Sequence, residues 1–212
     1  MAAKTQARRG GKDRLAETIV DAALELAEEV SWDGVRLHRV AERLGVPLAD
    51  IAGHYGDLDA IADAWFARAR DAMAAPPSPG FADLSARERL HSVIMRWFDA
   101  LAPARRVTGQ MIATKLYPSH PHHWVPLIFN LSRTIQWVRD AALLDATGRR
   151  RQVEEIGLSA LFLATLAVWL RDASSDQEET REFLRRRLAG ADGLMARMWG
   201  AGARGRDPQG TG

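Results

Sequence analysis

The sequence contains no cysteine among its 212 residues. This absence excludes a disulfide framework, a thiolate zinc site and a cysteine nucleophile, and it fits a reducing cytoplasm. The sequence also lacks a large excess of charge of one sign, because the formal net charge is only +2. The chain is therefore not a polycation as a whole, and any affinity for nucleic acid must come from local clusters of charge.

Motifs that carry catalysis are missing too. The sequence has no Gly-X-Ser-X-Gly elbow, no phosphate-binding glycine loop and no His-Glu-X-X-His helix, so we expect no enzyme, no catalytic residue and no cofactor. His120, His122 and His123 lie close together, and imidazole is a common metal ligand. Two prolines hold this segment extended and no carboxylate accompanies it, so we predict a solvated loop and no metal site.

No apolar run is expected to be long enough to span a bilayer, and the N-terminus lacks the apolar segment of a signal peptide. Together these absences predict a cytoplasmic protein. No alternation typical of strands occurs, and apolar residues recur at helical spacing, so the predicted fold is all-α with about nine helices. Composition divides the chain into four segments: a disordered basic arm (1–14), a small helical domain (15–74), a larger helical domain after the proline-rich break (81–199), and a disordered tail (200–212).

Residues 35–55 carry the pattern of two short helices around a tight turn. Leu37, Val40, Ala41 and Leu44 share one helical face, and Gly45 follows at once and can end the helix in the left-handed conformation. Pro47 suits the start of a second helix. This spacing predicts a helix-turn-helix unit, which presents its second helix to the major groove of DNA. The same spacing also fits an ordinary αα-corner.

The arrangement resembles the DNA-binding domain of TetR-family repressors over about residues 13–70. The resemblance depends on Ile19 to Ala27, Val40 to Val46, His54-Tyr55 and Leu58 to Ile61. It implies an all-helical homodimer that binds double-stranded operator DNA and is released when a small molecule enters the C-terminal helices. It also implies that 149–172 and 176–199 form the dimer through the last two helices. Small residues there would allow close helix approach: Gly157, Ser159, Ala160, Ala164 and Ala167.

The sequence departs from the family where the second helix would read DNA. The family usually has lysine, tyrosine and lysine where this chain has Leu48, Ala52 and Leu58. Residues 15–70 hold eleven acids against five bases, so the basic arm must offset an acidic head. The candidate DNA contacts are Arg8, Arg9, Lys12, Arg36, His38, Arg39, His54 and Tyr55. Among them the arginines are expected to position phosphates without specifying sequence.

A second resemblance supplies an alternative function. Ala164 to Asp176, followed by Glu179 to Leu188, is similar to the C-terminal domain of lipid-binding coenzyme Q biosynthesis proteins, which share the TetR fold. The similarity covers about residues 150–198. It implies a lipid-binding accessory protein of ubiquinone biosynthesis that does not bind DNA.

Large apolar side chains are frequent in the C-terminal part and supply surface for a cavity between helices. The candidate pocket residues are Trp97, Phe98, Met111, Trp124, Phe129, Trp137, Phe162 and Trp169. Few charged residues accompany them, so the expected ligand is a hydrophobic or aromatic small molecule, or a lipid. The alternative is that these side chains simply fill the core.

Overall fold

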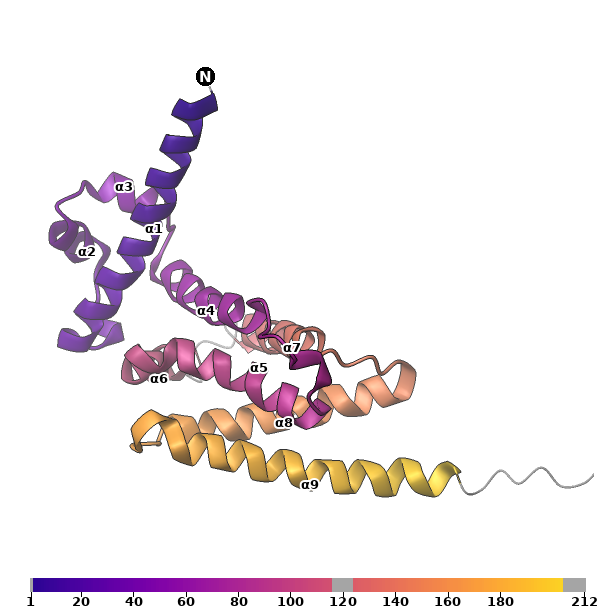
Figure 1. Ribbon diagram of the computed structural model, residues 1–212. Coiled ribbons are helices and arrows are strands. Elements are labelled where there is room, and N and C mark those ends of the chain that lie inside the picture. The colour runs from indigo at the N-terminus through magenta and orange to yellow at the C-terminus, as the bar shows by residue number, and fades with distance from the viewer. Residues whose placement is uncertain (1, 116–123, 204–212) are drawn as a thin grey trace, which may run out of the picture. The chain divides into compact units, whose positions relative to one another are not determined.

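The computed structural model describes residues 2–115 and 124–203, and the side chains of 13–115 and 130–190. All regular elements in these ranges are helical, as predicted, and the α-helices run from α1 to α9 (Figure 1). The chain forms two compact units: residues 1–72 with 97–131, and residues 73–96 with 132–212. We call them the head unit and the body unit.

The head unit is built on α1 (Ala2–Val30), against which α2 (Leu37–Leu44) packs, and α3 (Leu48–Ala52) packs against α2 (Figure 1). This unit also contains the short helices Trp32–Gly34 and Ala102–Ala104, most of α4 (Leu58–Ala74), α6 (Arg105–Lys115), the end of α5 (Ala86–Leu101) and the start of α7 (Trp124–Ala141). Its core contains Ile19, Val40, Ile51 and Ile61, each with none of its surface exposed. These are the apolar positions that helical spacing assigned to the inner faces.

Several side chains join α6 to the front of the chain. The backbone amide of Trp32 donates to Gln110 Oε1 at 2.7 Å, and Trp65 Nε1 donates to the buried Thr108 hydroxyl at 2.9 Å. These bonds explain why residues 97–131 cluster with the head unit. The proline-rich break at 75–80 is therefore close to one boundary, but the units differ from the predicted division into 15–74 and 81–199.

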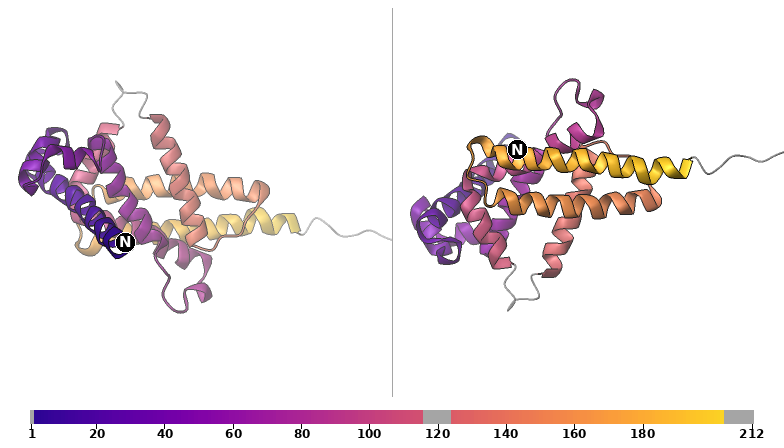
Figure 2. Two further views of the ribbon diagram at one scale, coloured as in Figure 1. Left: turned by 90° about the horizontal axis from the view of Figure 1, so that it is seen from above. Right: turned by 90° about the horizontal axis from the view of Figure 1, so that it is seen from below.

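The body unit contains the N-terminal part of α5 (Ala86–Leu101), the C-terminal part of α7 (Trp124–Ala141), α8 (Gly148–Trp169) and α9 (Glu178–Ala203). The last two helices lie side by side as an antiparallel pair (Figure 2). The centre of this core is formed by Val93, Val138 and Leu184, which have no exposed surface, and by Ile135, which is 2% exposed. The unit thus places a long two-helix layer over the ends of α5 and α7.

Local signals in the sequence mark helix starts correctly. Asp57 Oδ1 accepts from the amide of Ala60 at 2.7 Å, which is the expected N-cap of α4. Ser85 and Glu88 exchange hydrogen bonds at the start of α5, since the Ser85 amide donates to Glu88 Oε2 at 2.9 Å and the Glu88 amide donates to Ser85 Oγ at 3.3 Å.

The predictions about the chain ends and about a membrane-length apolar run need correction. The backbone of residues 2–14, predicted as a disordered arm, continues α1 as a helix. Residues 204–212 of the predicted disordered tail lie outside the described residues, and 200–203 belong to α9. We also expected no bilayer-length apolar run, but α8 is long and apolar enough to cross a membrane by length and composition. Its charges gather at 149–155, which leaves the rest of the helix uninterrupted.

Candidate nucleic-acid interface

The turn between α2 and α3 has the geometry that the sequence predicts. Gly45 adopts the left-handed conformation (φ 65°, ψ 31°) and its amide donates to the carbonyls of Ala41 and Glu42, while Val46 N donates to Ala41 O at 3.1 Å. Pro47 (φ −62°, ψ 145°) then precedes the first residue of α3 by one position. Val40 and Ile51 are fully buried, so both helices turn one face into the head unit and the other to solvent.

Three cationic or titratable side chains at the start of α2 are exposed: Arg36, His38 and Arg39. Arg36 Nη1 donates to the backbone carbonyls of Asp33 and Val35, at 2.8 Å each. Within the described residues, none of the three side chains is paired with a carboxylate. The positive charge of Arg36 and Arg39 is therefore available to phosphates, as a backbone-positioning contact requires.

Other arginines of the head unit neutralise the acidic face of α1. Arg43 of α2 lies 2.6 Å from Glu29 and 3.7 Å from Glu25. Arg68 of α4 lies 2.6 Å from Glu17 and 2.5 Å from Asp21. These pairs lower the repulsion that the acidic head would exert on a duplex, although each exposed pair contributes little to stability.

A further pair joins α6 to the same face, where Arg106 Nη2 lies 2.5 Å from Glu28 Oε2. Arg68 is the most buried of these arginines, and burial and the neighbouring carboxylates alter its pKa. Burial lowers the pKa of Arg68, but its hydrogen bonds and proximity to Asp21 and Glu17 outweigh burial and raise the pKa overall. Arg68 therefore stays charged and belongs to the scaffold of the head unit.

The two predicted contacts that follow α3 are engaged within the protein. Tyr55 is half-buried, and its hydroxyl donates to the carbonyl of Ala16 at 3.2 Å. Burial, with a smaller effect from Glu17, raises the pKa of this hydroxyl. His54 Nδ1 lies 2.7 Å from the carbonyl of Asp50, which requires a hydrogen on Nδ1. Tyr55 must release Ala16 before it can donate to a phosphate, so its main role in this structure is to anchor α3 to α1.

The remaining predicted contacts lie in the N-terminal part of α1. Arg8, Arg9 and Lys12 have a helical backbone, and their side chains lie outside the described ones. The predicted histidine loop, His120, His122 and His123, also lies outside the described residues. Among the side chains that the structure describes, no group of three or more His, Asp or Glu could hold a metal ion.

The exposed side of α3 carries no basic residue. Leu48 is 50% exposed, and Ala49, Asp50 and Ala52 are exposed as well. Residues 47–53 contain no arginine, lysine, asparagine, glutamine, serine or threonine. The exposed basic side chains of this region therefore lie on and around α2, and α3 exposes three apolar side chains and the acidic Asp50.

The body unit presents an apolar face on α8. The exposed large side chains on this helix are Val153 (41%), Ile156 (72%) and Leu163 (48%). The small residues between them, Gly157, Ala160, Ala164 and Ala167, are also exposed, whereas Ser159 is half-buried and donates to the carbonyl of Glu155 at 2.7 Å. A contiguous apolar face of this kind marks an interaction surface.

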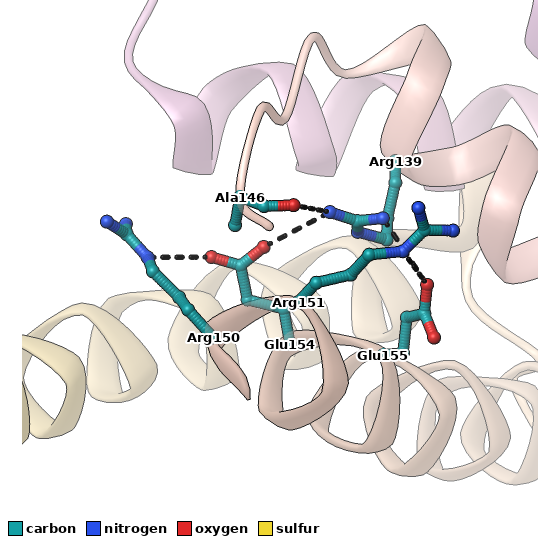
Figure 3. A network of polar contacts seen from close by, with 6 residues as sticks. All are labelled: Arg139, Ala146, Arg150, Arg151, Glu154 and Glu155. Atoms are coloured by element: carbon teal, nitrogen blue, oxygen red, sulfur yellow. Dashed lines mark hydrogen bonds and ion pairs between the residues drawn. The ribbon is translucent and has the colours of Figure 1, made fainter. Parts of the chain in front are cut away.

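A buried arginine fixes the corner that leads into α8. Arg139, near the end of α7, is 4% exposed. Its Nη2 lies 3.6 Å from Glu154 Oε2 and donates to the carbonyl of Ala146 at 3.0 Å, and its Nη1 lies 3.3 Å from Glu155 Oε1 (Figure 3). A buried guanidinium without such partners would be strongly destabilising, so these contacts hold α7 and α8 in one arrangement.

The same network explains the basic run at the start of α8. Arg150 and Arg151 lie one turn before Glu154 and Glu155 and pair with them at 3.2 Å and 2.8 Å (Figure 3). Such i,i+4 pairs offset the unfavourable interaction of cations with the N-terminal end of a helix.

Asp172 forms a second polar centre, between α8 and α9. Its carboxylate is 3% exposed and accepts from the amide and hydroxyl of Ser174 at 2.8 and 2.5 Å, and from the amide and hydroxyl of Thr180 at 2.9 and 2.6 Å. Burial acts to raise its pKa, but these four hydrogen bonds lower the pKa to about 2. The sequence pattern gives no signal for this residue, because its partners lie up to eight positions away.

The predicted pocket residues lie in both units. Trp97 (5% exposed), Phe98 (0%) and Met111 (1%) belong to the head unit, where Trp97 stacks on Phe66 with ring centroids 6.2 Å apart. Phe162 (3%) and Trp169 (0%) are buried in the body unit, and Trp137 is 50% exposed there. The side chains of Trp124 and Phe129 lie outside the described ones.

Two hollows of the body unit are lined by other residues. The larger, of about 970 Å³, lies among polar side chains of α5 and α9 that include His91, Glu178, Arg181 and Arg185. The smaller, of about 370 Å³, includes Arg87 and Glu88. None of the predicted pocket residues lines either hollow, so an apolar pocket stays a prediction.

A helix-turn-helix with exposed arginines, joined to a helical unit with an apolar outer face, defines a helical DNA-binding regulator. The chain is similar to the TetR transcriptional regulator from Nitrosomonas europaea ATCC 19718, with 43% identity, a TM-score of 0.75, and coverage of 84% of this chain and 98% of that chain. It therefore belongs to the TetR family of transcriptional regulators. A TetR transcriptional regulator from Rhodococcus sp. RHA1, at 22% identity and a TM-score of 0.58, shares the fold and covers 83% of this chain and 94% of that chain.

A second similarity is confined to the body unit. The COQ9 family model matches residues 153–194, which comprise most of α8, the Asp172 corner and the first half of α9. No curated protein matches the chain. Both sequence resemblances are thus confirmed, the TetR resemblance over most of the chain and the COQ9 resemblance over one helical pair.

Proposed function

We propose that this TetR-family regulator is a cytoplasmic homodimeric repressor that binds double-stranded operator DNA and releases it when an apolar small molecule binds. The observation that carries the proposal is the exposed cationic start of α2. Arg36 and Arg39 face solvent and are not paired with carboxylates of the described residues, whereas Arg43 and Arg68 neutralise the acids of α1. An acidic head with all its arginines paired would have argued against DNA binding.

The dimer is proposed to form through α8 and α9. Ile156 and its apolar neighbours on α8 leave a face that a second copy would bury, and the small residues Gly157, Ala160 and Ala164 permit two helices to approach closely. A dimer also matches the two-fold symmetry of a palindromic operator, which doubles every DNA contact made by one head unit.

The ligand is proposed to be hydrophobic or aromatic and to bind among the predicted pocket residues of the body unit. Phe162 and Trp169 are almost completely buried there, so ligand entry requires these side chains to move. A ligand shifts the regulator toward release only if it binds the DNA-free conformation more tightly.

A salt-dependent mobility-shift assay on DNA upstream of the protein's own gene tests the proposal. Tight binding that weakens with added salt and with deletion of residues 1–12 supports a repressor, because phosphate contacts are salt-sensitive. Absence of any shift at low salt would contradict operator binding. Apolar ligands added to the preformed complex then test release.

The COQ9 match favours a second candidate, a lipid-binding accessory protein of ubiquinone biosynthesis. Its support is the match over residues 153–194 and the exposed apolar face of α8. Mass spectrometry of solvent extracts separates the two candidates. Stoichiometric isoprenoid lipid in the purified protein, together with no DNA shift, would favour the lipid-binding candidate, whereas lipid-free protein that shifts DNA favours the repressor.

A further inference from the structure

Three of the four exposed side chains of α3 are apolar and lie within one narrow arc of the helix. Successive residues of an α-helix are 100° apart, so Leu48, Ala52 and Ala49 together span about 100° of the helix surface. Ile51, which is fully buried, lies outside this arc and points into the head unit. Leu48 is 50% exposed and both alanines are exposed, so all three side chains face away from the protein.

This face cannot read DNA through hydrogen bonds. The usual direct contacts are arginine or lysine to guanine and asparagine or glutamine to adenine, and residues 47–53 contain none of these side chains. Asp50 is the fourth exposed side chain and lies about 100° beyond Ala49, outside the arc. Its acceptor oxygens can accept from the N4 amino group of cytosine but are unfavourable beside the acceptor atoms N7 and O6 of guanine.

An apolar helix face does have one complementary group in the major groove. The C5 methyl of thymine is the apolar group on a base edge, and alanine-type side chains contact it. Ala49 and Ala52 are small, so they allow the backbone of α3 to approach the bases closely. Leu48 supplies the larger apolar contact at the first turn.

We propose that α3 recognises thymine methyl groups through Leu48, Ala49 and Ala52, and so selects its operator by apolar contacts. The proposal rests on the operator binding proposed above, because α3 reaches bases only if the head unit docks on a duplex. Arg36 and Arg39 on the adjoining α2 supply the phosphate contacts that hold α3 in the groove, and they carry no preference among bases.

Deoxyuridine substitution tests this directly, because uracil differs from thymine only by the missing methyl. Full-length protein would first select its binding site from random duplex DNA, and each thymine of the half-sites would then be replaced in turn. Loss of one buried methyl should weaken binding about fourfold, and about sixteenfold when both symmetric half-sites are changed. Deoxyuridine in flanking DNA is the control for non-specific effects.

A substitution in α3 tests whether the loss of affinity on removing the thymine methyl arises at this helix. Leu48→Ala should weaken binding to thymine DNA and should lose most of this effect on the uracil-substituted site, because the contact partner is already gone. Leu84→Ala is a matched control, since Leu84 is 39% exposed and lies in the body unit. It should leave affinity for both duplexes unchanged.

The outcomes separate this inference from the proposed function. Selection of a specific site that binds equally well with thymine and uracil overturns the thymine readout and leaves operator binding intact. A selected site without thymine in the half-sites would also overturn the thymine readout and leave operator binding intact. Failure to select any DNA overturns both proposals.

Discussion

Removal of the Arg39 guanidinium should lower the salt dependence of DNA binding by a calculable amount. Arg39 is exposed on α2, and its side chain, in contrast to that of Arg36, makes no hydrogen bond with a described residue. Its substitution by alanine therefore removes a charge with no expected change in the fold. If Arg39 contacts one phosphate in each half-site, a dimer of the Arg39→Ala variant makes two fewer phosphate contacts.

The magnitude follows from counterion release. Each phosphate contact contributes about −0.9 to the slope of log K against log salt concentration, so the variant's slope should be shallower by about 1.8. Between 0.1 and 0.2 M salt, the affinity ratio of wild type to variant should consequently fall about 3.5-fold. Fluorescence anisotropy with labelled operator, measured from about 0.05 to about 0.3 M salt, would give both the slope and the affinity ratio.

The control is Arg133→Ala, which removes the same charge from an exposed position of α7 in the body unit. Its slope should equal that of the wild type. An Arg39→Ala variant with an unchanged slope would refute the assignment of α2 as the phosphate-contacting helix, and an equal reduction in both variants would indicate a general effect of net charge.

Three further predictions concern the scaffold. Ile156→Glu should convert the proposed dimer into a folded monomer in light scattering, because this side chain is 72% exposed in one chain. Gln136→Glu, at an exposed position of α7, should leave the dimer intact. A dimeric Ile156→Glu variant would contradict the α8 interface. Gly45→Ala should lower the free energy of unfolding by about 1 kcal/mol in urea, since φ is 65° there, whereas Gly53→Ala (φ −72°) should have little effect. The pKa of Asp172 is lowered to about 2 from 3.8, so its carboxylate should contribute about 2 kcal/mol to the free energy of unfolding above pH 4, and this contribution is lost as the pH falls toward 2. Asp172→Asn should remove this pH-dependent part of the free energy of unfolding.

Features determined by neighbouring residues could be predicted from the sequence. The Gly45 turn and the Asp57 cap each depend on residues within four positions, and the structure confirms both. Pro47 was placed within one residue of its position, which is the usual uncertainty of helix ends.

Features determined by residues far apart in the sequence could not be predicted. Arg68 pairs with Asp21 across 47 positions and Arg106 with Glu28 across 78, so counting acids and bases along the chain could not show which acids are paired with arginines. Asp172 was missed because a capping residue is normally sought directly before its helix. The aromatic residues were grouped into one pocket because composition carries no information on which unit buries each ring.

The separation of charge from base recognition leads to a final, sharper test. Arg39 on α2 is expected to contact only phosphate, whereas Leu48 on α3 is expected to contact only bases. Arg39→Ala should therefore reduce the salt slope and leave the ranking of operator variants unchanged. Leu48→Ala should leave the slope unchanged and relax the preference for thymine. High-throughput binding to a library of single-base operator variants at two salt concentrations measures both quantities at once. If either substitution altered both slope and ranking, the two helices would not act as separate positioning and reading elements, and α2 would have to reach base edges itself.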